Sequence, residues 1–402
     1  MKAVIAGGGI GGLAAALALA LKGWEVEVLE QAPELAEVGA GVQISPNGMR
    51  VLDALGVTPL IEDSLFEPDA IEMRMGQGGR RIFRLPMKGY AARRWGARFV
   101  QIHRADLHEA LKARLGKVAG AVIRTGCAVT GYVQEKGGAS VYIDNGERVF
   151  GDLVVGADGI HSVIRAQMLG PDRARFTGNV AWRLTVPVSK LGGVTLPDGG
   201  CIWAGPGKHA VTTRIRGGSM ANFVGIVEQD NWTEEGWKIP GEKTDALRDF
   251  GDWDPVLAAI IAAADQPYRW ALHDRPPLIA WTEGPVALLG DAAHPMLPSM
   301  AQGAVQALED AVVLAACLGE QPADIKRALA AYEAARKPRA TAVQARSAAN
   351  LRMFHHRSPL RQLLAYGPIW LAARLSTNFI HARQDWIYGV DAAAEFRTPA
   401  SK

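Results

Sequence analysis

Two loops, near opposite ends of the sequence, have the residue types and spacing of anion-binding sites. Gly7, Gly9 and Gly12 form a G-x-G-x-x-G pattern between a short apolar run and a helical apolar run. The second loop begins at Gly290 with "GDAAHPMLPSMAQGA" and leads into another helical pattern. The N–H groups at a helix N-terminus attract phosphates and other anions. A ligand long enough to contact both loops accounts for the pair.

The first loop has the spacing of a dinucleotide site. Gly7 suits the turn, Gly9 allows the backbone to approach a pyrophosphate, and Gly12 allows the helix to pack on the strand. Glu30 follows the next strand-like run, where an acid binds ribose hydroxyls. The pattern predicts a dinucleotide but does not distinguish FAD from NAD.

The second loop favours FAD. Asp291 follows a buried strand-like run, where its carboxylate is placed to accept hydrogen bonds from a polyol such as the ribityl chain. The helix N-terminus near Gln302 suits the anionic reduced flavin, whereas NAD leaves this loop unexplained. An ordinary strand–loop–helix with a cap is the alternative. From the residues alone we predict cofactor contacts at Gly7, Gly9, Gly12, Glu30, Gly290, Asp291, Gln302, Gly303 and Ala304.

A βαβ unit is predicted to position the first loop, with a strand at 4–6, a helix at 13–21 and a strand at 26–29. The apolar run from Ala3 to Leu21 also permits a signal peptide or a membrane span. Its bunched glycines favour a turn instead. We further expect helices at 49–56 and 103–116, the latter capped near Ala105–Asp106, and a hairpin turning at Asn145–Gly146.

A change of pattern follows near residue 178. Short β-like runs separated by glycine-rich turns continue to about residue 270, which predicts a mostly antiparallel sheet inserted into an α/β domain. A strand at 286–294 and a helix at 302–319 then return to the α/β pattern. The chain from Pro322 onward is predicted to be mostly helical.

Composition excludes several classes of function. The 402 residues carry a net charge of +3, too little to predict nucleic acid or membrane as a partner. Cys127, Cys201 and Cys317 lack metal-ligand spacing and fit a reduced, cytoplasmic protein. His355–His356 is interpreted as a surface pair that binds no metal. A solvated helical face is expected to hold the basic residues Arg336, Lys337, Arg339, Arg346, Arg352, Arg357 and Arg361.

Several motifs occur in an order that resembles a known enzyme family. They are "GGGIGG", "HRADL", "VVGADGIHSVIR", "GDAAHPMLPSMAQGA", "LEDA" and "DWIYGVDA". Together they resemble the single-component FAD-dependent aromatic hydroxylases over essentially the whole chain. The nearest group contains salicylate hydroxylase, 3-hydroxybenzoate 6-hydroxylase and 6-hydroxynicotinate 3-monooxygenase.

The resemblance implies a fold. It is an α/β, glutathione-reductase-like FAD-binding domain of the Rossmann type, with an inserted antiparallel substrate sheet and a helical C-terminal region. The FAD-binding parts are expected at 1–70, 99–177 and 271–350. Substrate-domain strands are expected at 71–98, the substrate sheet at 178–270 and the helical tail at 351–402.

The resemblance also implies an activity. NADH or NADPH, bound transiently, reduces non-covalent FAD, O2 reacts to a hydroperoxyflavin, and oxygen is transferred to a small phenolic acid. Arg104 and Asp158 match family positions that contact FAD. The family often has glycine where Ala301 stands. We expect a monomer or a homodimer.

His209 matches the histidine that activates the substrate phenol in these hydroxylases, although a lone strand histidine is more often structural. Trp182, Trp203 and Phe223 are predicted to wall the substrate pocket, and Arg183 or Arg214 to bind a substrate carboxylate. The flavin-side loop is expected to place Pro295, Met296 and Ser299 beside the substrate. Relatives carry a histidine at the position of Ser299 or a glutamine near Pro298, and this sequence has neither.

Two alternatives remain open from the sequence. The first is a flavoprotein that acts on a non-phenolic substrate, with His209 incidental. The second is a nicotinamide-only dehydrogenase or a non-catalytic nucleotide-binding protein, which the Asp291 loop disfavours.

Overall fold

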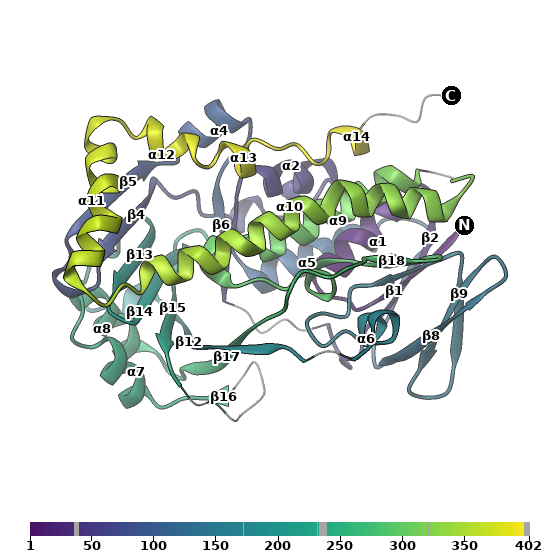
Figure 1. The fold of residues 1–402 in the computed structure, drawn as a ribbon, viewed down its shortest axis with the longest axis horizontal. Coiled ribbons are helices and arrows are strands. Elements are labelled where there is room, and N and C mark those ends of the chain that lie inside the picture. The colour runs from purple at the N-terminus through teal and green to yellow at the C-terminus, as the bar shows by residue number, and fades with distance from the viewer. Residues whose placement is uncertain (36–39, 172, 231, 233–238, 320–321, 398–402) are drawn as a thin grey trace.

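The computed structural model describes residues 1–35, 40–171, 173–230, 232, 239–319 and 322–397. A parallel sheet with its helices occupies one half of the molecule and an eight-stranded sheet the other (Figure 1). The last five residues of the expected helical tail, 398–402, lie outside the described part.

The first half is built on a six-stranded sheet in the order β18-β19-β11-β1-β2-β7. All neighbours are parallel except β18 and β19. Helix α1 (Ile10–Leu21) links β1 to β2 and is almost wholly buried, so Ala3–Leu21 forms the predicted strand, turn and helix. The strands are β1 (Lys2–Ala6), β2 (Glu25–Leu29), β7 (Ala121–Arg124), β11 (Leu153–Gly156), β18 (Thr282–Glu283) and β19 (Val286–Leu288).

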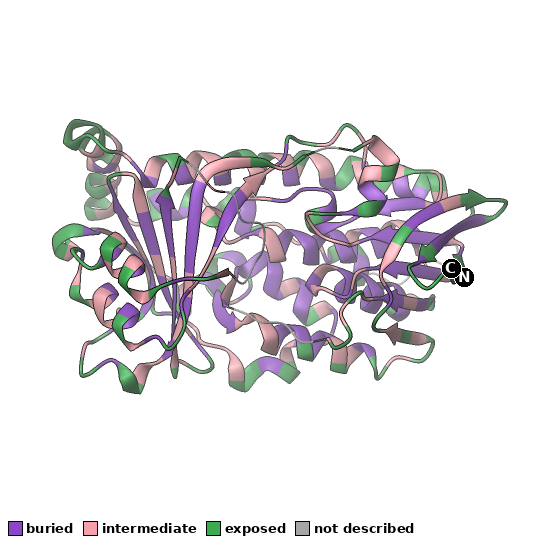
Figure 2. Cartoon of the chain, turned by 90° about the horizontal axis from the view of Figure 1, so that it is seen from below, coloured by how far each residue is buried: buried purple, intermediate pink, exposed green. Residues whose placement is uncertain are grey.

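The second half is built on a sheet in the order β16-β17-β12-β15-β14-β13-β4-β5. Its neighbours are antiparallel except β4 and β13. Its strands are mostly buried, since side chains pack on both faces (Figure 2). The strands are β4 (Ala70–Met75), β5 (Arg81–Pro86), β12 (Arg175–Pro187), β13 (Gly199–Gly205), β14 (Lys208–Ile215), β15 (Met220–Glu228), β16 (Ile239–Pro240) and β17 (Tyr268–Asp274).

Two small sheets complete the β-structure. Strands β8 (Val129–Glu135), β9 (Gly138–Ile143) and β10 (Arg148–Gly151) form a meander with the predicted turn, where the Asn145 side chain accepts from Glu147 N at 2.8 Å. Strand β3 (Gly41–Ile44) pairs with β6 (Val100–His103).

Helix α5 (Arg104–Leu115) shows one wrong prediction. Its N-cap is His103, whose Nδ1 accepts a hydrogen bond from Ala105 N at 3.2 Å. The cap was predicted near Ala105–Asp106, but these residues already lie in the first turn. Asp106 there contributes a favourable negative charge instead.

The remaining α-helices lie at the sheet faces and ends. Helix α2 (Pro46–Ala54) packs against α9 (Gly303–Leu318), and α9 packs against α1. The others are α3 (Thr58–Ile61), α4 (Tyr90–Trp95), α6 (Val163–Leu169), α7 (Lys243–Phe250), α8 (Pro255–Ala263), α10 (Ile325–Phe354), α11 (Pro359–Leu375), α12 (Asn378–Ala382), α13 (Asp385–Tyr388) and α14 (Ala394–Arg397). No helix in the described ranges has the length and apolar character needed to cross a membrane.

Helix α10 joins the two halves. With 30 residues it is about 45 Å long, and it runs from α9, in the half built on the six-stranded sheet, to the eight-stranded sheet (Figure 1). Its end beside that sheet carries Phe354 and, as the C-cap, His355.

Buried ion pairs hold α10 to α9. Arg336 is 2% exposed, and its Nε and Nη1 bind Asp310 Oδ1 at 2.7 Å and Glu309 Oε2 at 2.5 Å. Arg339 Nε binds Glu309 Oε2 at 2.7 Å. Burial alone raises the pKa of Asp310, but His294 and Arg336 lower it to about 2. The predicted solvated basic face is therefore wrong for Arg336 and Arg339, because both neutralise carboxylates of the neighbouring helix.

The ion pairs predict a large stability effect at Arg336. Arg336→Met keeps most of the side-chain volume but leaves two carboxylates buried without their partner, a loss of roughly 3–5 kcal/mol. The thermal midpoint of the FAD-loaded protein should fall by several degrees in a calorimetric scan. Arg327→Met, at an exposed position of the same helix, is the control. Equal midpoints for the two variants would contradict a stabilising role.

Candidate active site

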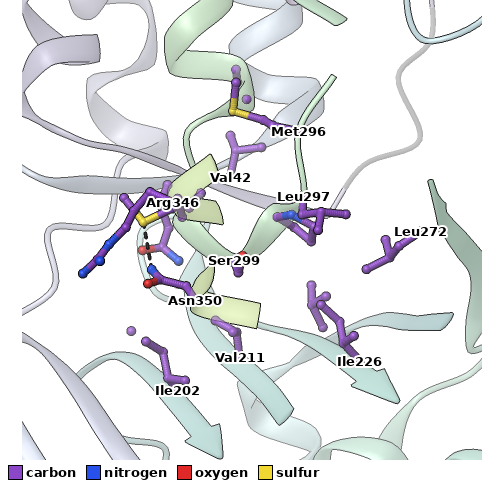
Figure 3. A pocket seen from close by; sticks show the side chains of 18 of the residues that line it. Val42, Ile202, Val211, Ile226, Leu272, Met296, Leu297, Ser299, Arg346 and Asn350 are labelled. Carbon is purple, nitrogen blue, oxygen red and sulfur yellow. Dashed lines mark hydrogen bonds between the residues drawn. The ribbon is translucent and has the colours of Figure 1, made fainter. Parts of the chain in front are cut away.

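One cavity of about 1120 Å³ connects the two halves of the molecule. Both predicted anion-binding loops line it at one end, and strands β13, β14 and β15 line it at the other. Figure 3 shows Ile202, Val211 and Ile226 extending from these strands toward the loop that carries Leu297 and Ser299. The volume slightly exceeds that of common small-molecule pockets, as expected for a cofactor together with a substrate.

The three glycines of the first loop divide their roles as predicted. A Cβ on Gly7 (φ +103°) would lie 2.4 Å from Ala157 O, and one on Gly12 would lie 2.0 Å from Gly7 O. A Cβ on Gly9 would meet no atom within 4 Å, and Gly9 lines the cavity. Gly7 and Gly12 therefore permit the tight turn, while Gly9 leaves its cavity side open to a pyrophosphate.

Glu30 lies beside this loop, just outside the cavity lining. Its carboxylate accepts hydrogen bonds from Gly8 N at 2.7 Å and from Ala32 N at 2.9 Å. These bonds fix the acid at the end of β2, where the fingerprint places the ribose of a dinucleotide.

Arg104 and Asp158 lie differently relative to the cavity. Arg104 lines it from the first residue of α5, next to the second loop. Asp158 does not line it: its carboxylate accepts from Val163 N at 2.8 Å and from Ile164 N at 3.2 Å, at the start of α6. Its neighbours Ala157 and Gly159 line the cavity instead. Asp158 therefore shapes the turn through α6.

The second loop presents its carboxylate to the cavity. Asp291 lies within the molecule, but its side chain is exposed where it lines the cavity. Its carboxylate makes no hydrogen bond with the described residues. Enclosure raises the pKa of Asp291, although the charges of His294 and Arg104 oppose the rise. An enclosed acceptor without a protein donor suits a ligand that brings hydroxyl groups.

The N-terminus of α9 forms the adjoining wall. Gly303 and Ala304 of its first turn line the cavity, together with Gly290. Gln302 does not: its Nε2 donates to Ser45 Oγ at 2.9 Å, which ties α9 to the start of α2. Ala301 adopts left-handed backbone angles (φ 50°), a conformation that glycine adopts more easily than alanine.

These features fit FAD. An open glycine at the first helix, an acid with no hydrogen-bond donor among the described residues, and a second helix N-terminus line one cavity. The pyrophosphate, the ribityl chain and the pyrimidine end of the flavin need groups of these three kinds.

His209 lies at the sheet end of the cavity. Strand alternation turns His209, Val211 and Thr213 of β14 toward the cavity. The His209 side chain is fully buried, and its Nδ1 lies 2.6 Å from His355 Nε2. Its Nε2 has no hydrogen-bond partner among the described residues. Burial and the neighbouring His355 lower the pKa of His209 well below its usual value.

The same alternation contradicts three predicted wall residues. Trp182, Trp203 and Phe223 point to the opposite face of the sheet, where they pack in one core with Phe250 and Trp253. These three aromatic side chains belong to that core and do not line a substrate pocket. The wall on the cavity side is aliphatic, with Ile202, Val211, Val224 and Ile226.

The predicted arginines separate in the same way. Arg214 faces away from the cavity, toward Asp198 and the ring of Phe66, so its predicted contact with a substrate is wrong. Arg183 lines the cavity, with its guanidinium 4.5 Å from the centre of the Trp270 ring.

Pro295, Met296 and Ser299 all line the cavity, as predicted. The Ser299 hydroxyl donates to Ser347 O at 2.5 Å, which holds the loop against α10. Arg346 and Asn350 of α10 line the same region, and Asn350 Nδ2 lies 2.8 Å from Met300 Sδ (Figure 3). Sequence reasoning missed both residues as cavity residues, although their i, i+4 spacing places them on one helix face.

The interpretation of His355 as a surface residue is wrong. Its side chain is buried, with Nε2 against His209 and Nδ1 3.2 Å from Glu228 Oε1. No local pattern signals this pair, because 146 residues separate the two histidines. The described residues contain no cluster of three or more His, Cys, Asp or Glu side chains that could hold a metal ion.

The geometry predicts the effect of removing the second-loop acid. Asp291→Ala deletes the enclosed acceptor, so FAD affinity should fall by about 1.5–3 kcal/mol, or roughly 10- to 100-fold. Fluorescence quenching of titrated FAD measures the affinity, and the circular dichroism spectrum checks the fold. Asp291→Asn, which keeps an acceptor oxygen, should lose less. Wild-type affinity in Asp291→Ala would restrict the residue to a structural role.

Comparison with known proteins agrees with the geometry. The family described as FAD binding domain matches residues 1–347. The chain is 36% identical to 3-amino-4-hydroxybenzoate 2-monooxygenase of Streptomyces platensis, over 98% of this chain and 96% of that protein. It is 35% identical to 3-hydroxybenzoate 6-hydroxylase of Polaromonas naphthalenivorans, over 97% and 96%.

A solved structure extends the likeness to the whole fold. It is that of Klebsiella pneumoniae HpxO with FAD and uric acid, which has a TM-score of 0.83 and 28% identity and covers 95% of this chain and 96% of that one. The fold, the loops that fit FAD and the full-length relatives lead to one conclusion: this chain belongs to the FAD binding domain family, among its FAD-dependent aromatic hydroxylases.

Proposed function

We propose that this enzyme hydroxylates a small phenolic aromatic acid at the sheet end of the cavity, using NADH or NADPH and O2. The observation that carries this proposal is the unpartnered Nε2 of His209, the acceptor a phenolic hydroxyl needs. Its relatives act on 3-amino-4-hydroxybenzoate and 3-hydroxybenzoate, both phenolic acids, as their names state.

The surroundings of His209 favour the neutral ring. With its pKa lowered by burial and by His355, the imidazole carries no charge at pH 7. If Nδ1–H donates to His355, the buried Nε2 keeps a lone pair that is free to accept a hydrogen bond. A free phenol has a pKa of about 10 and a free histidine one of about 6.5, so the site must also stabilise the phenolate. Deprotonation makes the ring a better nucleophile toward oxygen.

Apolar side chains line this end of the cavity. Ile202, Val211 and Ile226 extend from the sheet, and Leu297 lies across from them on the flavin-side loop (Figure 3). FAD, when bound, supplies the activated oxygen. An apolar enclosure limits its unproductive loss as hydrogen peroxide.

A carboxylate on the substrate needs a cation near this end. Arg183 of β12 keeps the role predicted from sequence, and Arg346 of α10 is a second candidate, since it stands with Ser299 and Asn350 at the cavity (Figure 3). Cytoplasmic location and a monomeric or homodimeric state stay predictions.

The substrate class is tested with a panel of aromatic acids. Purified protein should be yellow and release FAD on denaturation. 3-Hydroxybenzoate, salicylate, 3-amino-4-hydroxybenzoate and 6-hydroxynicotinate are compared for NADH or NADPH oxidation and for hydroxylated product. Uric acid, found in the similar HpxO structure, represents the non-phenolic alternative. Product from uric acid and from none of the phenolic acids would overturn the proposal.

The role of His209 has its own prediction. His209→Ala should bind FAD normally and still be reduced by NADH, because the residue lies outside both cofactor loops. At saturating phenolic substrate the hydroxylation rate should fall by about 10²–10⁴-fold, the usual contribution of a general base. Hydrogen peroxide formed per NADH should rise correspondingly, as measured by a peroxidase-coupled assay. His356→Ala, which lies outside the cavity lining, is the control. Wild-type coupling in His209→Ala would assign ring activation to another group.

A further inference from the structure

A chain of three side chains connects the cavity to solvent. His209 Nδ1 lies 2.6 Å from His355 Nε2, and His355 Nδ1 lies 3.2 Å from Glu228 Oε1. The two imidazoles are buried, whereas the Glu228 side chain is one-third exposed. The residues come from β14, the end of α10 and β15.

We propose that His355 and Glu228 conduct the proton of the bound phenol from His209 to solvent. This inference rests on the proposed function, in which a phenol binds at His209 Nε2. It makes His355 the second member of a proton relay and Glu228 its exit.

The proton transfer balances along the chain. The phenolic O–H bond breaks as a proton binds His209 Nε2, and His209 Nδ1–H passes its proton to His355 Nε2. His355 Nδ1–H passes its proton to the Glu228 carboxylate, which releases it to water. Both imidazoles end neutral, in the opposite tautomers, and the phenolate keeps the electron pair. No oxidant or further reactant is required.

Backbone hydrogen bonds hold the residues of the proposed relay in place. Gly207, in the turn between β13 and β14, donates its N–H to His355 O at 3.1 Å and accepts from Glu228 N at 2.9 Å. The same turn therefore fixes both outer members of the relay relative to β14. Arg357 Nε binds Glu228 Oε2 at 3.1 Å and orients the carboxylate at the surface.

The charges facing the chain match this role. Burial lowers the pKa of His355, against the opposing effect of Glu228, so the ring is neutral at pH 7 and able to pass a proton on. Burial raises the pKa of Glu228, but the hydrogen bonds from Arg357 and His355 lower it overall. A carboxylate with a lowered pKa gives up a proton to water quickly.

A purely structural pair would leave one feature unexplained. If His355 only filled space behind His209, an apolar side chain at 355 would avoid burying a second imidazole. The buried ring instead spans the gap between a cavity acceptor and a surface acid. Each ring nitrogen on this path lies against another polar atom except His209 Nε2, which is buried and has no hydrogen-bond partner among the described residues.

The test compares His355→Gln with His356→Gln in FAD-loaded enzyme. The probe is the phenolic acid of the panel that is hydroxylated best. Stopped-flow mixing with a pH indicator follows proton release as this acid binds. Glutamine can hydrogen-bond His209 but does not relay a proton, so release should slow roughly 10²-fold in His355→Gln, the lower end of general acid–base effects. FAD affinity and flavin reduction should stay unchanged, and His356→Gln should match wild type.

Two further variants separate a relay from a structural role. Glu228→Gln keeps an acceptor for His355 Nδ1–H but removes the carboxylate, and it should also slow proton release. In His355→Gly, added imidazole should restore the release rate in a concentration-dependent way, because a free imidazole replaces the missing proton carrier. If His355 were only structural, imidazole would raise the release rate of His355→Gly no more than a neutral analogue of similar shape, such as pyrrole.

The outcomes distinguish this inference from the proposed function. If His209→Ala loses coupled hydroxylation but His355→Gln releases protons at the wild-type rate, the relay is wrong and His209 remains the base. If His209→Ala hydroxylates normally, the proposed function of His209 fails first. The relay is supported if proton release is slow in both His209→Ala and His355→Gln and if imidazole restores it in His355→Gly.

Discussion

The buried contact between α9 and α10 is the constraint on which the site depends. Arg336 lies between Glu309 and Asp310, and Asp310 also binds His294 of the flavin-side loop. Charges removed from water are tolerated only in a close and complete arrangement, so this contact permits one register of the two helices. That register positions the flavin-side loop on one side and the far end of α10 on the other.

Helix α10 transmits the constraint over a long distance. The helix is continuous through Pro338, and Arg339 on the far side of that proline also binds Glu309, so the contact with α9 directs the end at His355 toward the eight-stranded sheet. On the way, Ser347 receives the Ser299 hydroxyl and Asn350 meets Met300, which sets the flavin-side loop. Cofactor loop, substrate sheet and proton path are therefore positioned by one element.

The two ends of the cavity differ in polarity because their tasks differ. At the cofactor end, Asp291 and two helix N-termini provide hydrogen bonds and partial charges for a polar, anionic ligand. At the sheet end the lining is mainly aliphatic, and His209, Thr213 and Asn222 are among its polar residues. A polar group in such surroundings selects its partner by position, since leaving it unpaired is costly.

The sequence by itself determined the features that depend on neighbours along the chain. The glycine loop, the Asp291 loop, the inserted sheet and most strand and helix positions follow from local spacing, and the structure contains them all. The alternation of side chains along the strands could also be predicted, but the face of the sheet that lines the cavity could not. Trp182, Trp203, Phe223 and Arg214 were therefore predicted on the wrong face. Only the tertiary structure decided that Arg336 is buried and that His355 lies behind His209. Both depend on contacts between segments far apart in sequence, where the partner that makes burial of a polar group favourable leaves no local signal.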